Sequence, residues 1–79
     1  MKLEKAIQYK INQICKEKDI TISKLAELSC LTQSSVNNLI NGHSKNPKTL
    51  TILRICDGLG IKLKDFYDDP IFDNIDRED

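Results

Sequence analysis

The chain has 79 residues, of which 39% are hydrophobic, enough for one small core and a single domain. Its twelve basic and twelve acidic side chains cancel, so the total charge neither favours nor excludes a nucleic-acid ligand. No run approaches the roughly 20 apolar residues that cross a bilayer. The first residues also lack an apolar signal segment, so we expect a soluble, cytoplasmic protein with no membrane partner.

The charges are unevenly distributed along the chain. Residues 1–67 hold eleven basic and six acidic side chains, a net charge of +5, whereas residues 68–79 carry a net charge of −5. We therefore expect a mildly basic domain over residues 1–67 and an acidic C-terminal tail over residues 68–79. A frayed, solubilising tail is the first expectation, and a tail that repels DNA or engages a protein partner is the alternative.

The cysteines and the histidine indicate neither a metal centre nor an enzyme. Cys15, Cys30 and Cys56 are widely spaced without a CxxC pair, so we expect reduced thiols that lie partly in the core. His43 is the single histidine, and the chain lacks a Gly-rich phosphate loop. These groups are too few for acid–base or nucleophilic catalysis. We expect no enzymatic activity, no cofactor and no metal.

Apolar residues recur at spacings of three and four, and this pattern predicts an all-α, compact five-helix fold. The helices are expected at about residues 3–18, 22–29, 33–41, 49–59 and 63–67. Thr21 and Thr32 precede the second and third helices, where a hydroxyl accepts a hydrogen bond from a free amide. Gly42 is placed to end the third helix in a left-handed conformation.

The second and third helices are joined by a turn of about four residues and form a helix-turn-helix arrangement. Leu25, Ala26 and Leu28 are expected on the buried face of the second helix. Val36 and Leu39 are expected on the buried face of the third. A side chain larger than that of Ala26 would hold the two helices apart at their closest approach.

This stretch resembles the Xre or Cro-type repressors, related to the lambda and 434 repressors. The resemblance is carried by TISKLAELSCLTQSSVNNLING at residues 21–42, by Pro47, by LRICDGLG at residues 53–60 and by LKDFY at residues 63–67. It covers residues from about 5 to 67 and implies a lambda-repressor-like domain that binds double-stranded DNA. It also implies a bacterial or phage origin, and repression rather than activation.

The third helix carries amides and hydroxyls where a surface helix usually has charges, and such groups read base edges in the major groove. Poor helix formers follow one another here, and base recognition supplies a reason for them. A plain solvated surface is the alternative. The resemblance places base reading at the start of this helix and one turn later, on Gln33, Ser34 and Asn38, with Asn37 as a neighbour.

Phosphate contacts are expected around this face, where they set the register of the protein on the duplex. They are expected from Thr21, Ile22, Lys24, Ser35, Asn41, His43, Lys45 and Lys48. For Lys24 and His43, a solvated side chain with no role is the alternative.

Three features depart from the family pattern. Cys30 stands where the turn commonly has Gly, so a residue with a β-carbon must adopt a left-handed or strained conformation, at a cost of about 1 kcal/mol. Ile22 stands where a Gln often grips a phosphate. Lys45 and Lys48 are few charges for a DNA clamp.

Few phosphate contacts predict weak binding by one copy. We therefore expect a homodimer on a palindromic operator, with two recognition helices about 34 Å apart. Its contact is expected from Leu63, Phe66, Tyr67, Ile71 and Phe72. For Phe66 the alternative is that it covers the monomer core. A function of another class also stays open, in which the fold is a protein-interaction module, such as an antitoxin or a regulatory subunit.

Overall fold

The computed structural model describes residues 1–42 and 46–77, and this part of the chain is all-helical. The predicted fold class is confirmed, and the helices agree with the predicted ranges to within one residue at each end. The elements are α1 (Leu3–Lys18), α2 (Ile22–Leu28), α3 (Gln33–Ile40), α4 (Thr49–Leu59), α5 (Leu63–Tyr67) and the 3-10 helix η1 (Pro70–Phe72).

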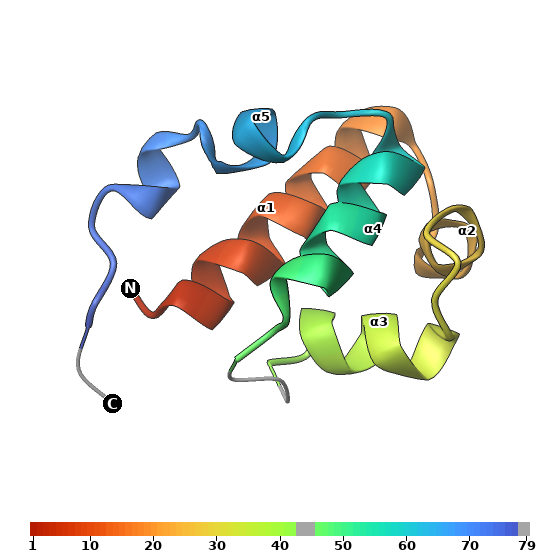
Figure 1. Ribbon diagram of the computed structural model, residues 1–79, viewed down its shortest axis with the longest axis horizontal. Helices are drawn as coiled ribbons and strands as arrows, with labels where there is room; N and C mark the ends of the chain where they lie inside the picture. The colour runs from red at the N-terminus through yellow and green to blue at the C-terminus, as the bar shows by residue number, and fades with distance from the viewer. Residues whose placement is uncertain (43–45, 78–79) are drawn as a thin grey trace.

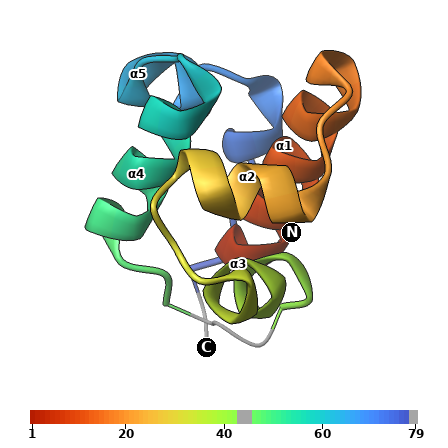
Figure 2. The same cartoon turned by 90° about the vertical axis from the view of Figure 1, so that its right-hand side faces the viewer.

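The helices surround one core. Figure 1 shows α4 in front of α1, with α3 along the lower edge and α5 at the upper edge. In Figure 2 the same molecule is turned, and α2 faces the viewer between α4 and α1, above α3. α2 packs on both α3 and α4, whereas α3 also packs on α1. The helix-turn-helix pair is thus supported by the two longest helices.

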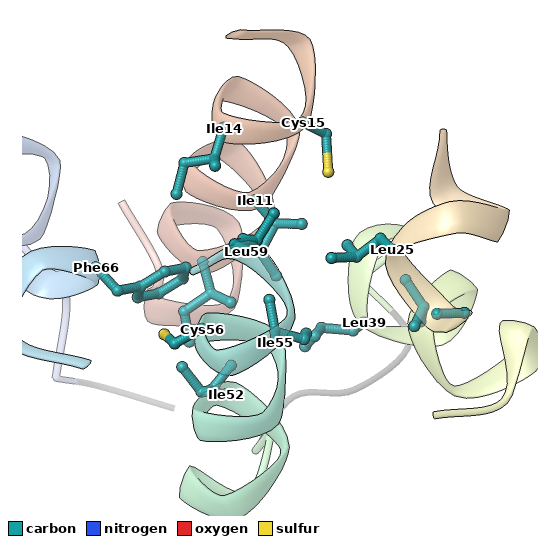
Figure 3. Close-up of a cluster of buried hydrophobic side chains, with 13 residues drawn as sticks. Ile11, Ile14, Cys15, Leu25, Leu39, Ile52, Ile55, Cys56, Leu59 and Phe66 are labelled. Atoms are coloured by element: carbon teal, nitrogen blue, oxygen red, sulfur yellow. The ribbon is translucent and has the colours of Figure 1, made fainter. Parts of the chain in front are cut away.

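The core is filled by aliphatic side chains from every helix together with one aromatic ring. Ile11, Leu25, Val36, Ile55 and Phe66 have no exposed surface. Figure 3 shows Phe66 and Leu25 entering the core from opposite sides of α4. Burial of each such side chain contributes roughly 1.5–3 kcal/mol.

The two predicted threonine caps are confirmed. The Thr21 hydroxyl oxygen accepts a hydrogen bond from the Lys24 amide at 3.1 Å, and the Thr32 hydroxyl oxygen accepts one from the Ser35 amide at 3.1 Å. The expectation for Leu28 is wrong, since its side chain is 42% exposed. α2 is only seven residues long, and Leu25 and Ala26 already occupy its inward face.

The turn between α2 and α3 confirms the left-handed conformation expected at Cys30, whose φ angle is 56°. The chain reverses there because the Leu31 amide donates to the Ala26 carbonyl at 3.0 Å. Ala26 is buried, as expected for a small residue between the helices.

Gly58 fixes the distance between α2 and α4. A β-carbon at this position would lie 2.6 Å from the Ser29 hydroxyl oxygen and 2.9 Å from the carbonyl carbon of Leu28. Neither atom can give way cheaply, because one is buried and the other belongs to the backbone. The end of α2 therefore rests directly on the backbone of α4.

Gln8 of α1 holds the end of α3. With its side-chain nitrogen facing α3, the amide donates to the Ile40 carbonyl at 3.2 Å and accepts from the Gly42 amide at 3.0 Å. Gly42 has the predicted left-handed conformation, with a φ of 77°, and a β-carbon there would lie within 2.6 Å of the Gln8 amide. One side chain thus satisfies two backbone groups that the end of α3 leaves free.

The first part of the segment after α5, residues 69–72, is packed on the domain, which differs from the frayed tail expected there. The Lys10 ammonium lies 2.8 Å from an Asp69 carboxylate oxygen, and the other Asp69 oxygen accepts from the Ile71 amide at 2.9 Å. The Phe72 ring packs on Phe66 and Tyr67, with ring centres 6.0 Å and 5.1 Å away. An ion pair and an aromatic cluster together hold η1 against α1.

For Phe66 the structure supports the alternative expectation over a dimer contact. This ring has no exposed surface and covers the monomer core, which was the alternative expectation. Leu63 and Phe72 are partly buried and pack against the same core. Ile71 is half-buried, and Tyr67 is 37% exposed. The residues expected at a dimer contact are therefore largely occupied within their own chain.

We expect the Lys10–Asp69 pair to make stability depend on acid pH. The hydrogen bond from Lys10 holds the pKa of the Asp69 carboxyl below its ordinary value. Asp69 then contributes stability above its pKa in the unfolded chain, about pH 4, and the contribution is lost as the pH falls through the lower folded value. Lys10→Met should therefore lose stability at neutral pH and show a weaker acid dependence. Denaturant titrations from pH 7 to acid pH measure both.

Lys16→Met is the matched control, because Lys16 is exposed on the same helix. It should keep the acid dependence of the wild type. If Lys10→Met and the wild type lose stability in parallel, the pair does not carry the effect.

We expect Gln8→Leu to loosen the end of α3. The substitution keeps much of the side-chain volume but leaves the Ile40 carbonyl and the Gly42 amide without partners, at a cost of about 1–3 kcal/mol. Amide hydrogen exchange at Gly42 should accelerate more than exchange in α1. Asn12→Leu, at an exposed position on the same helix, is the control. Unchanged exchange at Gly42 would contradict the role of Gln8.

Candidate nucleic-acid interface

α3 turns a neutral polar face outward. Gln33, Ser34 and Asn38 are exposed, and Asn37 is half-buried. Val36 and Leu39 have the opposite orientation and are buried. The other labelled helices lie above α3 in both views (Figures 1 and 2). The four residues expected to read bases are thus brought together on one accessible helix, three of them fully exposed.

Ser23 of α2 orients the first of these side chains. Its hydroxyl donates a hydrogen bond to the Gln33 carbonyl oxygen at 3.1 Å. The oxygen keeps a second lone pair and the amide nitrogen keeps both protons, so Gln33 can still donate and accept at an adenine. Sequence reasoning missed Ser23. The usable signal is the motif itself, because it brings the starts of its two helices together.

The residues expected at phosphates have different surroundings. The Thr21 hydroxyl caps α2, and Ile22 is partly buried against the core, so the start of α2 offers backbone amides rather than a long polar side chain. The Lys24 ammonium lies 3.6 Å from the Glu27 carboxylate, so its charge is already paired within α2. Ser35 accepts a hydrogen bond from the Thr32 hydroxyl at 2.8 Å, and its own proton stays free to be donated.

A shallow cavity of about 670 Å³ lies between α3 and the start of α4. It is lined by Ser35, Asn38, Leu39, Asn46, Pro47, Lys48 and Thr51. The N-cap residue of α4 is Lys48, whose side chain makes no capping hydrogen bond to the first amides of this helix. The cavity joins a residue expected to read bases with two expected at phosphates. Asn46 and Thr51 were not foreseen, since a polar loop gives no periodic signal.

The remaining expected positions divide into two groups. Asn41 is exposed at the C-cap of α3. His43 and Lys45 lie outside the described residues.

The three cysteines differ in their burial and form no metal-binding group in the described part of the chain. Cys15 and Cys56 are buried and Cys30 is exposed, all as free thiols. Burial raises the pKa of the Cys15 and Cys56 thiols, which keeps them protonated at neutral pH. Residues 1–42 and 46–77 contain no group of three or more metal-ligating side chains. Within those residues, no helix is long and apolar enough to cross a membrane.

Comparison with known proteins agrees with this geometry. A family model described as a Cro/C1-type helix-turn-helix DNA-binding domain matches residues 10–70. A solved structure, the crystal structure of the prophage Lp1 protein 11, is 33% identical with a TM-score of 0.82. The match covers 95% of this chain and 100% of that chain. Comparison with curated proteins finds no match.

The family match spans α2, α3 and the cavity between α3 and α4, so it covers the polar face described above. The resemblance to Cro-type repressors is thereby confirmed. The chain belongs to the family of Cro/C1-type helix-turn-helix DNA-binding domains and is a DNA-binding transcription regulator.

Proposed function

We propose that the chain is a sequence-specific repressor that inserts α3 into the major groove of a palindromic operator and binds it as a homodimer. The supporting observation is the exposed, neutral and amide-rich face of α3. An α-helix with its side chains is about 10–12 Å in diameter, which fits the width of the major groove. The alternative of a plain solvated surface explains neither the absence of charge nor the contacts that hold both ends of this helix.

In this proposal the base contacts come from the α3 face. Gln33 pairs through its amide with the N6 and N7 atoms of an adenine, and Asn38 does the same one turn later. Ser34 lies beside them and serves as donor or acceptor. Asn37 is half-buried and takes a lesser part.

Phosphates are contacted on both sides of the inserted helix. On one side the DNA strand follows the cavity between α3 and α4, where Ser35, Lys48 and the first backbone amides of α4 contact it. On the other side it passes the start of α2, near Thr21, Ile22 and Lys24. Asn41, His43 and Lys45 extend the proposed contact beyond the end of α3.

The acidic segment does not obstruct this arrangement. In Figure 1, η1 and residues 73–77 lie at the left end of the long axis, whereas α2 and the first turn of α3 lie at the right. The apolar residue Phe72, which an interaction module would offer to a protein partner, packs on Phe66 and Tyr67 instead. DNA binding is therefore the better-supported proposal.

Substitutions on the α3 face and beside it should have different effects. Gln33→Ala should weaken binding to a selected operator by about 1–3 kcal/mol and relax the preference at one base pair. Lys48→Ala should weaken binding to all sequences alike and lower the salt dependence by about one counterion. Fluorescence anisotropy titrations on the operator and its single-base variants, at several salt concentrations, separate the two effects.

Two further variants sharpen this test. Ser23→Ala should give a smaller loss at the same base pair as Gln33→Ala, because it frees the amide to rotate without removing it. Asn12→Ala, at an exposed position on α1, is the control and should bind like the wild type. If Gln33→Ala keeps both affinity and base preference, α3 does not read DNA in the proposed way.

A further inference from the structure

The outer face of α4 carries apolar side chains that the described residues leave uncovered. Leu50 is 55% exposed and Leu53 is 39% exposed, whereas the opposite side of the helix is buried in the core. At 100° per residue, Arg54 and Asp57 lie on this same outer side. We call these four residues, Leu50, Leu53, Arg54 and Asp57, the α4 face.

The α4 face lies at the side of the molecule, next to the DNA-facing edge. Figure 1 looks down the shortest axis and shows α4 in front of α1, and in Figure 2 the same helix forms the left boundary. The first turn of α4 is the part of that helix nearest to the level of α3 in both views. A two-fold axis that runs along this side, toward the DNA, would keep both copies of α3 on one duplex.

The dimensions of the chain favour this side for a contact between two copies. Its extents are 33 × 23 × 20 Å, and the α4 face is met along the shortest of them. Half of the 20 Å extent from each copy, together with about 10 Å between the two packed helices, places the centres of two such copies about 30 Å apart. Successive major grooves on one side of a duplex are about 34 Å apart, so the spacing suits an operator of two half-sites.

A contact through η1 fits less well. This segment lies at one end of the 33 Å axis. Half of that extent from each copy, together with about 10 Å between the packed helices, places the centres more than about 40 Å apart. The rings at this end are also packed on their own chain.

The charges of the α4 face are complementary to themselves. Arg54 and Asp57 are both exposed, and neither forms an ion pair with another of the described residues. In a two-fold contact the same patch meets itself, so an Arg54–Asp57 pair between copies would form twice around the leucines. We propose that the α4 face is where two copies of this chain meet. Its role at an operator rests on the proposed function, whereas the self-association does not.

The direct test is the oligomeric state of the full chain without DNA. Sedimentation equilibrium over a wide concentration range should show a monomer–dimer equilibrium. Leu50→Gln combined with Leu53→Gln should raise the dimer dissociation constant at least about tenfold. Tyr9→Gln is the control, since Tyr9 is 58% exposed on α1. Circular dichroism should show the same helix content in all three proteins, because the replaced residues are outside the core.

Exchanging the charges provides a second test. Arg54→Asp should weaken the dimer because it places two acidic residues opposite each other, and adding Asp57→Arg should restore it. Restoration by the second substitution would not follow from a general loss of stability. If the leucine variant dimerises like the wild type, or if the double charge variant stays as weak as the single one, the α4 face is not the contact.

Binding to DNA distinguishes this proposal from the previous one. On a duplex with two inverted half-sites the wild type should bind cooperatively, whereas the leucine variant should lose the cooperativity and keep its affinity for a single half-site. If the wild type binds no single half-site, the proposed function is contradicted, whereas the proposal of a dimer through the α4 face is unaffected. A wild type that stays monomeric in solution and binds two half-sites independently would overturn the α4 proposal alone.

Discussion

The polar face of α3 is useful for recognition only if this helix of eight residues is held in one orientation. A helix as short as α3 is not stable by itself in water, so its position comes from tertiary contacts. Thr32 caps its start, Val36 and Leu39 anchor its inner face, and Gln8 satisfies the backbone groups at its end. With both ends and one face fixed, the outer face is free to carry residues chosen for recognition rather than for helix stability.

Close backbone approaches extend this support to the rest of the helix-turn-helix motif. Gly58 lets α2 rest directly on α4, and Ala26 lets the two helices of the motif approach each other. Cys30 completes the turn in a left-handed conformation, with an energetic cost of about 1 kcal/mol that the surrounding packing must offset. Small residues and one strained turn thus connect the recognition helix to the core through short, rigid contacts.

Much of this fold follows from local features of the sequence. The spacing of apolar residues predicts the helices, Thr21 and Thr32 predict the starts of α2 and α3, and Gly42 predicts the end of α3. Each of these features depends only on neighbours within a few residues of the chain. The outward orientation of Gln33 follows in the same way, since Val36 and Leu39 determine which side of α3 is buried.

Other features depend on residues far apart in the chain, and periodicity carries no information about them. Gln8 meets Gly42 and Lys10 meets Asp69 only after the helices have packed. The acidic composition of the C-terminal segment indicated a free tail, but Phe72 and Asp69 supply enough specific contacts to hold part of it. Leu28 shows the opposite error, in which an apolar residue near a helix end remains at the surface.

Selection of bound sequences from a random pool of DNA duplexes shows whether the polar face of α3 recognises DNA. We predict that the wild type enriches one short sequence, present as two inverted copies with centres about one helical turn, 10 base pairs, apart. Asn38→Ala should enrich sites in which one position of each copy is no longer fixed. A pool without enrichment, or the same sites recovered by both proteins, would contradict recognition of DNA by the polar face of α3.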